Sequence, residues 1–183
     1  MKITLPMSSE VARSLKAGDH CTLSGVLYTA RDAAHKRLCE AISKNEPLPI
    51  DLKDSVIYFV GPAPAKPGQV IGSAGPTTSY RMDAHSPALI ELGQTGMIGK
   101  GRRDKTVVDA MKEHGAVYFG AIGGCGALIA GSIKKCEVIA YPDLGAEAIH
   151  RLVVEDFPVV VVIDSRGNNL YETGRDAYLK ENG

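Results

Sequence analysis

Short apolar segments alternate with short amphipathic ones along the whole chain, and this alternation restricts the fold more than any other feature. The run 159–163 is entirely apolar, which is typical of a strand covered on both faces. Residues 104–114 place their apolar side chains on one helical stripe, and Gly115 follows as a suitable helix end. No linker or repeat divides the chain, so we expect one α/β domain over residues 1–183, with a mixed sheet and layered packing. The polar C-terminal end, about ten residues, is expected to fray.

Local signals predict the other elements. Asp32 is expected to cap a helix that runs to Ser43, and Ser86–Pro87 begins a second helix that ends near Gly93. Residues 22–29 are typical of either a tight hairpin or a bulged strand, because a Ser-Gly pair interrupts their β-branched pattern. Further strands are expected at residues 55–60, 69–73, 117–119 and 136–141, and a small apolar helix after the glycine-rich residues 123–126.

The charge balance excludes several classes of partner. Lys and Arg number 21 and Asp and Glu number 21, so the formal net charge is zero with His neutral. Such a chain offers no basic field to a nucleic-acid backbone or an anionic membrane. Its longest apolar run is far short of the roughly 20 residues that a membrane span requires, and the N-terminus lacks an apolar signal segment. We therefore expect a cytoplasmic protein that binds neither nucleic acid nor membrane.

The four cysteines do not form a metal-binding or redox motif. Cys21, Cys39, Cys125 and Cys136 lie far apart, without a Cys-x-x-Cys pair. Local zinc and iron–sulfur motifs bring cysteines much closer together in sequence. The sequence therefore predicts reduced thiols with packing roles, Cys125 included, and no metal site held by this chain.

Two glycine-rich segments approach nucleotide-binding patterns without matching them. In residues 93–101 the glycine spacing is too long for a phosphate-binding P-loop, and Gly101 stands where a Ser or Thr would bind magnesium. In residues 124–129 the third glycine of a dinucleotide-binding fingerprint is replaced by Ile129. Neither segment is expected to bind a nucleotide.

What remains is a set of cationic and hydroxyl side chains in glycine-rich turns. Arg31 precedes a helix directly after a strand, and Thr77, Thr78 and Arg81 share one tight turn. Lys100 stands between two glycines, where a ligand can approach the backbone closely. Arg binds a carboxylate through two parallel hydrogen bonds, and Lys acts as a point charge. These residues therefore suit a small substrate with two carboxylates.

Spacing alone leaves a simpler alternative open and favours it. Arg31 and Arg81 would then pair with Asp32 and Asp83, which lie close by in the sequence, and Lys100 would be solvated. Surface ion pairs of this kind are common and contribute little to stability.

Three motifs contain these residues: Arg31-Asp32-x-x-His35, Gly75-Pro-Thr-Thr-x-x-Arg-Met-Asp83 and Gly99-Lys100-Gly101. In this order they resemble the β region of the class I, iron–sulfur-dependent fumarate and tartrate dehydratases. The resemblance extends in order from about Val11 to Tyr171. Further stretches that resemble the same family are residues 120–124, 141–149, 154–158 and 164–168.

The resemblance implies a fold, an activity and a partner. The β region of this family adopts a layered β/β/α swivelling domain. Its members reversibly add water across the double bond of a dicarboxylate, and a [4Fe–4S] cluster held by the α region binds the substrate. The α region is fused ahead of the β region in some members and is a separate subunit in others. Because this chain starts at a Met directly before the β region, we expect a separate β subunit with an α subunit as its partner, and possible self-association into a homodimer when isolated.

The resemblance also assigns roles to residues. Arg31, Arg81 and Lys100 match the positions that hold the substrate carboxylates. Thr77 and Thr78 match the hydroxyl pair beside the substrate, with Thr77 as the candidate proton-abstracting group. A threonine hydroxyl is a very weak base, so nearby cations would have to stabilise its anion.

Supporting residues surround these positions. His35 is expected either to orient Arg31 or Asp32 or to lie on the helix surface, since it follows them by one helical turn. Asp83 is expected to hold Arg81. Three basic residues after Lys100 are expected on a solvated face or at the contact with the α subunit: Arg102, Arg103 and Lys105.

The substrate and the role of the chain have alternatives. The stretches 141–149 and 154–158 resemble fumarases more than tartrate dehydratases, so we expect fumarate and malate as the substrates. Tyr80 favours tartrate or a related diacid, because many fumarases carry a smaller residue there. A non-catalytic module that binds a dicarboxylate or docks a partner is a further alternative, as is a subunit that only stabilises its partner. The combination of Thr77, Thr78 and Lys100 with two arginines favours catalysis.

Overall fold

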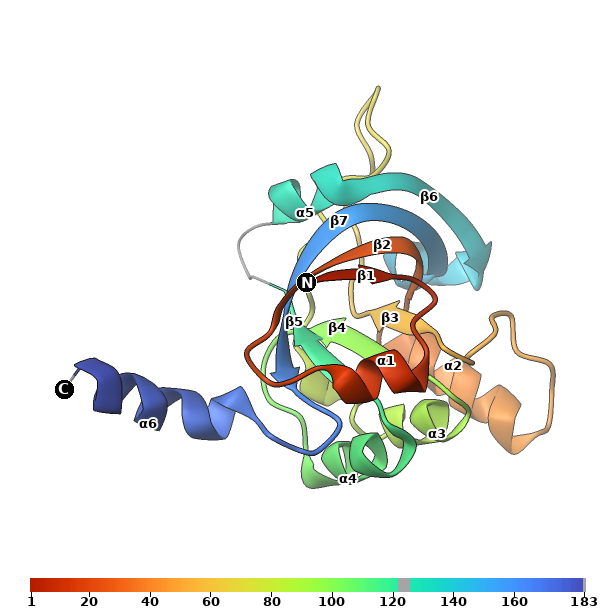
Figure 1. Ribbon diagram of the computed structural model, residues 1–183. Coiled ribbons are helices and arrows are strands. Elements are labelled where there is room, and N and C mark those ends of the chain that lie inside the picture. The colour runs from red at the N-terminus through yellow and green to blue at the C-terminus, as the bar shows by residue number, and fades with distance from the viewer. Residues whose placement is uncertain (122–125, 183) are drawn as a thin grey trace.

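A computed structural model describes residues 1–121 and 126–182 of the chain (Figure 1). Within these residues, seven strands alternate with short helices. The strands are β1 (Lys2–Thr4), β2 (His20–Thr29), β3 (Val56–Tyr58), β4 (Gly96–Gly99), β5 (Val117–Gly120), β6 (Ile133–Ala140) and β7 (Ile149–Ile163). The α-helices are α1 (Ser9–Ser14), α2 (Asp32–Ser43), α3 (Ser86–Glu91), α4 (Lys105–His114), α5 (Gly126–Ser132) and α6 (Leu170–Asn182), and the 3₁₀ helices are η1 (Ser79–Met82) and η2 (Pro142–Glu147).

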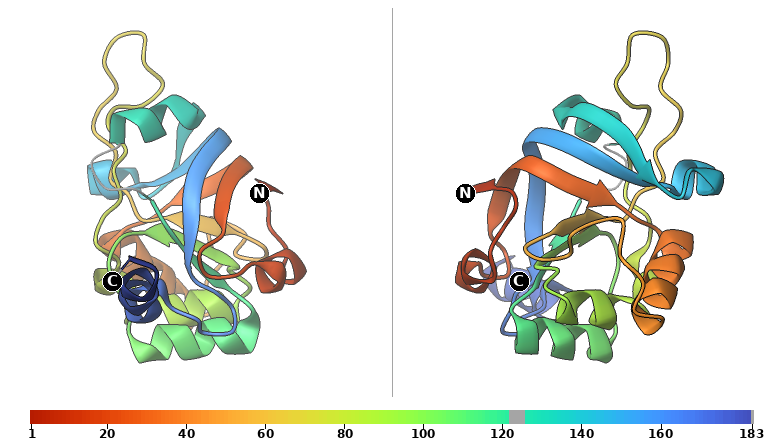
Figure 2. Two further views of the ribbon diagram at one scale, coloured as in Figure 1. Left: turned by 60° about the vertical axis from the view of Figure 1, so that its left-hand side comes forward. Right: turned by 90° about the vertical axis from the view of Figure 1, so that its right-hand side faces the viewer.

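The sheet closes into a five-stranded barrel. Strands β2, β3, β4 and β5 are parallel neighbours in this order, and the long β7 pairs antiparallel with both β5 and β2. Strands β1 and β6 pair with β2 and β7 outside the barrel. Helices α2, α3 and α4 lie together along one side of the barrel, and α5 and β6 lie at the opposite side (Figures 1 and 2). The predicted mixed α/β class is confirmed. The sequence did not predict that the sheet closes into a barrel.

Strand β3 shows how the barrel is filled on both faces. Tyr58 and Val60 belong to the apolar cluster that alternate residues of the barrel strands form inside it. Ile57 and Phe59 point the other way and pack in the cluster under α2, α3 and α4. Because successive side chains of a strand point to opposite faces, both sets are buried and the strand is apolar throughout.

The local signals for α4 are confirmed. The Asp104 carboxylate accepts a hydrogen bond from the Val107 N–H at 3.0 Å, as an N-cap residue does. Gly115 ends the helix with φ of 78°, in the left-handed region that favours glycine. Residues 22–29 form the bulged strand of the two alternatives, with a register shift between Leu23 and Gly25.

Two other local predictions are wrong. Residues 69–73 form no strand and belong to a long loop. Arg31 occupies the N-cap of α2, and Asp32 is the first helical residue. The Arg31 side chain makes no capping hydrogen bond, so its guanidinium remains free to reach other groups. Residues 123–125, which include Cys125, lie outside the described residues, and α5 begins at Gly126 as expected. Within the described ranges, no helix is long and apolar enough to cross a membrane.

Candidate functional site

The predicted site residues lie at one end of the barrel. Arg31 follows the carboxyl end of β2, and Lys100 follows the carboxyl end of β4. Thr77 is brought to the end of β3 by its backbone, since its N–H donates to the Phe59 carbonyl at 2.7 Å. Strands β2, β3 and β4 are parallel, so their carboxyl ends meet at the same edge. Ligands of parallel sheets bind at such edges.

The turn that carries the two threonines contacts the turn that carries Lys100. Thr78 and Lys100 form an isolated parallel bridge, and the Ser79 N–H donates to the Lys100 carbonyl at 2.9 Å. A Cβ atom at Gly99 would lie 2.0 Å from Ser79 Oγ, so only glycine permits this approach. The Lys100 side chain is exposed, and no described residue forms an ion pair with it. Thr78 and Lys100 are therefore held together through their backbones.

Arg31 and Arg81 meet on either side of Asp32. One carboxylate oxygen, Asp32 Oδ1, lies 3.7 Å from Arg31 Nε and 3.7 Å from Arg81 Nη1. Both separations exceed a hydrogen bond, and Asp32 Oδ1 and Arg31 Nε are buried with no hydrogen-bond partner among the described residues. The Asp32 carboxylate thus holds the two guanidinium groups near each other without forming a hydrogen bond to either.

Glu147 is a partner of Arg31 that the sequence did not indicate. Its carboxylate lies 3.0 Å from Arg31 Nη2 and accepts the Ala33 N–H at the start of α2 at 3.3 Å. Glu147 is the last residue of η2, more than one hundred positions away in sequence. Only its membership in the stretch 141–149, which resembles the family, could have pointed to it. Arg31 therefore has two carboxylate neighbours, whereas Arg81 has one.

His35 lies beneath Arg31 in the core and not on the helix surface. Its side chain is fully buried, and its ring meets the ring of Phe59 edge-on at 5.3 Å between centroids. Burial lowers the pKa of His35 to about 4, although a hydrogen bond to the backbone of Arg31 opposes the shift. The imidazole is therefore neutral at pH 7, and its Nδ1–H donates to the Arg31 carbonyl at 2.9 Å. Of the two alternatives, orientation of Arg31 through its backbone is the one that fits.

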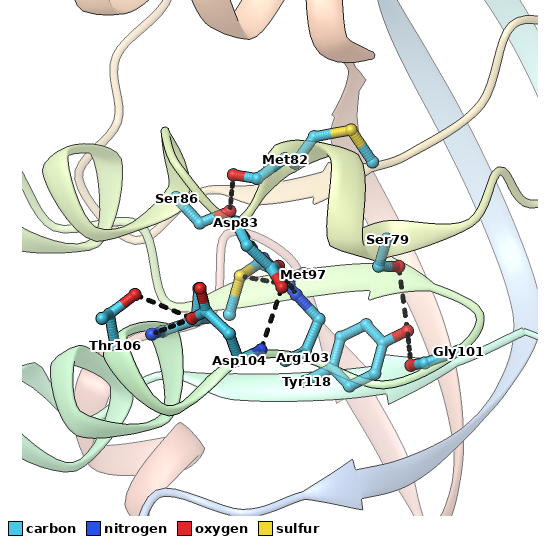
Figure 3. Close-up of polar contacts among 11 residues, drawn as sticks. Ser79, Met82, Asp83, Ser86, Met97, Gly101, Arg103, Asp104, Thr106 and Tyr118 are labelled. Atoms are coloured by element: carbon cyan, nitrogen blue, oxygen red, sulfur yellow. Dashed lines mark hydrogen bonds and ion pairs between the residues drawn. The ribbon is translucent and has the colours of Figure 1, made fainter.

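Asp83 binds a different arginine from the one expected. Asp83 Oδ1 lies 2.6 Å from Arg103 Nε, and Asp83 Oδ2 accepts the Asp104 N–H at 2.9 Å (Figure 3). The prediction that Asp83 holds Arg81 is wrong, because Arg81 faces Asp32 instead. The ion pair joins the end of η1 to the segment between β4 and α4.

Arg103 is a buried cation, so its predicted place on a solvated or partner-facing surface is also wrong. Its side chain has no exposed area, and Nη2 donates to Ser86 Oγ at 2.7 Å. The guanidinium carbon lies 5.2 Å from the ring centroids of both Phe59 and Tyr118. Two aromatic faces and a carboxylate replace the water that the cation loses.

The described residues do not supply ligands for an iron–sulfur cluster. They contain no group of three or more His, Cys, Asp or Glu side chains placed to hold a metal ion. Cys21 is buried and Cys39 and Cys136 are half-buried, and burial raises the pKa of all three thiols. A raised pKa disfavours the thiolate that iron binds.

Comparison with known proteins identifies the family. The family described as Fumarase C-terminus matches residues 1–174. The class I aerobic fumarate hydratase of Salmonella typhimurium is 44% identical over 153 residues, which is 82% of this chain and 26% of that protein. Fumarate hydratase 2 of Leishmania major is 44% identical over 156 residues, which is 84% of this chain and 28% of that protein.

A relative of about the same size also exists. The putative L(+)-tartrate dehydratase subunit beta of Methanocaldococcus jannaschii is 39% identical over 183 residues, which is 96% of this chain and 94% of that protein. The chain thus spans little more than a quarter of the fumarate hydratases and nearly all of this subunit. The chain belongs to the Fumarase C-terminus family, and it is homologous to class I fumarate hydratases and to a tartrate dehydratase β subunit.

Proposed function

We propose that this chain is the β subunit of an iron–sulfur-dependent hydro-lyase that reversibly hydrates fumarate to malate. An α subunit would hold the [4Fe–4S] cluster and complete the site. The near-complete coverage of the tartrate dehydratase β subunit supports a separate β subunit. The high identity to the fumarate hydratases over most of this chain supports the reaction type.

The pairing of Arg31 with Arg81 across Asp32 is the observation that carries this proposal. The two guanidinium groups each lie 3.7 Å from one carboxylate oxygen, at the barrel edge where Lys100 and the Thr77–Thr78 pair also lie. A carboxylate of the substrate can take hydrogen bonds that Asp32 leaves unmade. A dicarboxylate needs two such positions, and three cations near one edge can supply them.

The same cations favour the chemical step. Loss of a proton from the carbon beside a carboxylate moves negative charge onto that carboxylate. Arg81 and Lys100, which lie at this edge, would stabilise this developing charge more than they stabilise the ground state. Thr77 is the proposed base, and its hydroxyl forms no hydrogen bond with a described side chain. Its anion would therefore depend on the surrounding positive charge.

Tartrate or a related hydroxy-diacid is the second candidate substrate. The tartrate dehydratase β relative supports it, because that relative matches this chain nearly end to end. Tyr80 gives little support to tartrate, because this residue is 65% exposed. A Tyr80 that points to solvent leaves the turn as open as a smaller residue would. Fumarate and malate therefore remain the preferred pair.

The test is an anaerobic affinity purification of the tagged chain from its native host, followed by assays of iron, malate dehydration and tartrate dehydration. We expect a second, iron-bearing subunit and conversion of malate to fumarate. Activity on tartrate alone would change the substrate. A chain that elutes alone, free of iron and inactive, while a control cluster enzyme survives the same treatment, would contradict the proposal. The non-catalytic binding module would then be the better account.

A further inference from the structure

The backbone of Gly101, directly after Lys100, is bound by two tyrosine hydroxyls, one at its N–H and one at its carbonyl. Its N–H donates to the hydroxyl of Tyr171 at 3.0 Å. Its carbonyl accepts a hydrogen bond from the hydroxyl of Tyr118 at 2.9 Å. Gly101 has φ of 83°, a conformation that favours glycine, so the chain turns sharply at this point. Two side chains from distant elements, β5 and α6, thus fix the backbone that follows Lys100.

The hydroxyl of Tyr118 also reaches the threonine turn. It lies 2.9 Å from Ser79 Oγ, and Ser79 directly follows Thr78 (Figure 3). A consistent arrangement has the Ser79 hydroxyl donating to Tyr118 and the Tyr118 hydroxyl donating to the Gly101 carbonyl. Burial raises the pKa of Tyr118, which keeps its proton in place at any physiological pH. One hydroxyl therefore joins the turn of Thr78 to the turn of Lys100.

The ring of Tyr118 is held in a fixed position. The side chain is fully buried, and the Arg103 guanidinium lies 5.2 Å from its ring centroid. Arg103 is itself fixed by Asp83 at 2.6 Å. Because the ring is fixed, its hydroxyl is a fixed point for the groups that it binds. The backbone of Gly101 is therefore held in place by this hydrogen bond.

We infer that Tyr118 and Tyr171 are positioning residues for Lys100, and that they fix its turn against the Thr77–Thr78 turn for catalysis. This inference rests on the proposed function. The Lys100 side chain is long, flexible and exposed, so its ammonium is placed only as well as its backbone. Displacements of about 1 Å in a catalytic site can reduce the rate about a hundredfold.

Tyr171 supports this role independently of Tyr118, through a separate hydrogen bond to Gly101. It lies in the first turn of α6, and its side chain is 39% exposed. Helix α6 extends away from the barrel in Figure 1. A hydroxyl in this position contributes little to the core, whereas its bond to the Gly101 N–H acts directly beside Lys100.

A double-mutant cycle in the assembled complex tests the inference. The variants are Tyr118→Phe, Lys100→Ala and their combination, with kcat/KM for malate measured well below the melting temperature of each. We expect roughly a tenfold loss for Tyr118→Phe and about a hundredfold loss for Lys100→Ala. The double variant should be little worse than Lys100→Ala, because a hydroxyl that acts through Lys100 has no effect in its absence. Tyr171→Phe should show the same non-additivity with a smaller loss.

Tyr58→Phe is the matched control. Tyr58 is equally buried in the neighbouring part of the barrel, and its hydroxyl donates to the Ala74 carbonyl and not to the Lys100 turn. Its effect should add to that of Lys100→Ala. An additive cycle for Tyr118→Phe in an active complex would overturn the inference and leave the proposed function standing. A wild-type complex without turnover of malate would overturn the proposed function and the inference together.

Discussion

Arg31 is the most firmly held of the candidate cations, and a buried histidine and a half-buried glutamate hold it. His35 fixes its backbone carbonyl at 2.9 Å, and Glu147 fixes its guanidinium at 3.0 Å. Arg81 and Lys100 are more exposed and carry fewer contacts. At the scale of single residues, the site therefore combines one rigid cation with two that a substrate can recruit.

The buried, neutral state of His35 predicts a specific loss of stability in mild acid. The pKa of His35 is about 4 in the folded chain against a usual value near 6.5. Between these values the unfolded chain binds a proton that the folded chain does not, so the free energy of unfolding falls as the pH falls from 6.5 toward 4. Between pH 7 and pH 5 this difference amounts to about 2 kcal/mol.

The comparison variant is His35→Gln, which can still donate a hydrogen bond but does not titrate. Urea unfolding at pH 7 and pH 5 should show that the wild type loses about 2 kcal/mol more than the variant over this interval. His150, whose pKa burial also lowers, is present in both proteins, so the difference isolates His35. Equal losses in the two proteins would show that His35 titrates normally in the folded state.

Sequence reasoning succeeded at residues whose neighbours are local and failed where they are distant. The motifs named Arg31, Arg81 and Lys100, and the fold brings the turns that carry them to one edge of the barrel. They could not show that Arg103 is buried, because an arginine in a run of basic residues has the pattern of a solvated face. Its partner Asp83 lies twenty positions away, and only the fold brings the two together.

Among the elements, the contact between η1 and the segment from β4 to α4 determines the shape of the site. Local signals predicted α4 and its glycine end, since the helical stripe and the terminal glycine lie within a few residues of one another. The closure of the barrel had no local signal. It depends on pairing of β7 with β2, which joins residues more than a hundred positions apart, and with β5, which joins residues forty or more positions apart.

Loss of the Arg103 side chain should weaken the contact between η1 and the segment from β4 to α4. Arg103→Met leaves the Asp83 carboxylate, only 9% exposed, without its ion pair. We expect a loss of about 3–5 kcal/mol in the free energy of unfolding, measured with urea. Arg103→Met combined with Asp83→Asn removes the unpaired charge and should recover part of this loss.

Arg37→Met is the control for this experiment. Arg37 pairs with Asp143 at the surface, where ion pairs contribute about 0–1 kcal/mol, so this variant should change stability little. A double variant at positions 103 and 83 that is no more stable than Arg103→Met alone would refute the account of the buried pair.

For the whole molecule, the barrel gathers the candidate cations at one edge and leaves them open to a partner. Arg81 is 36% exposed and Lys100 is exposed, although both are placed close to residues of the barrel core. The three cations near this edge outnumber the two carboxylates, Asp32 and Glu147, by one. This charge balance would suit the anionic substrate proposed above, and the exposure of Arg81 and Lys100 is compatible with the proposed completion of the site by a second subunit.

The turnover of an assembled complex that carries Arg81→Ala tests this account most directly. Arg13→Ala is the control, since Arg13 is an exposed arginine of α1 whose side chain donates to the Glu113 carbonyl, away from the site. We predict that Arg81→Ala reduces kcat/KM for malate by at least about a hundredfold, roughly 3 kcal/mol of transition-state stabilisation, while Arg13→Ala stays near the wild type. An assembled, iron-loaded complex with Arg81→Ala that turns over malate as fast as the wild type would contradict the catalytic role of this edge.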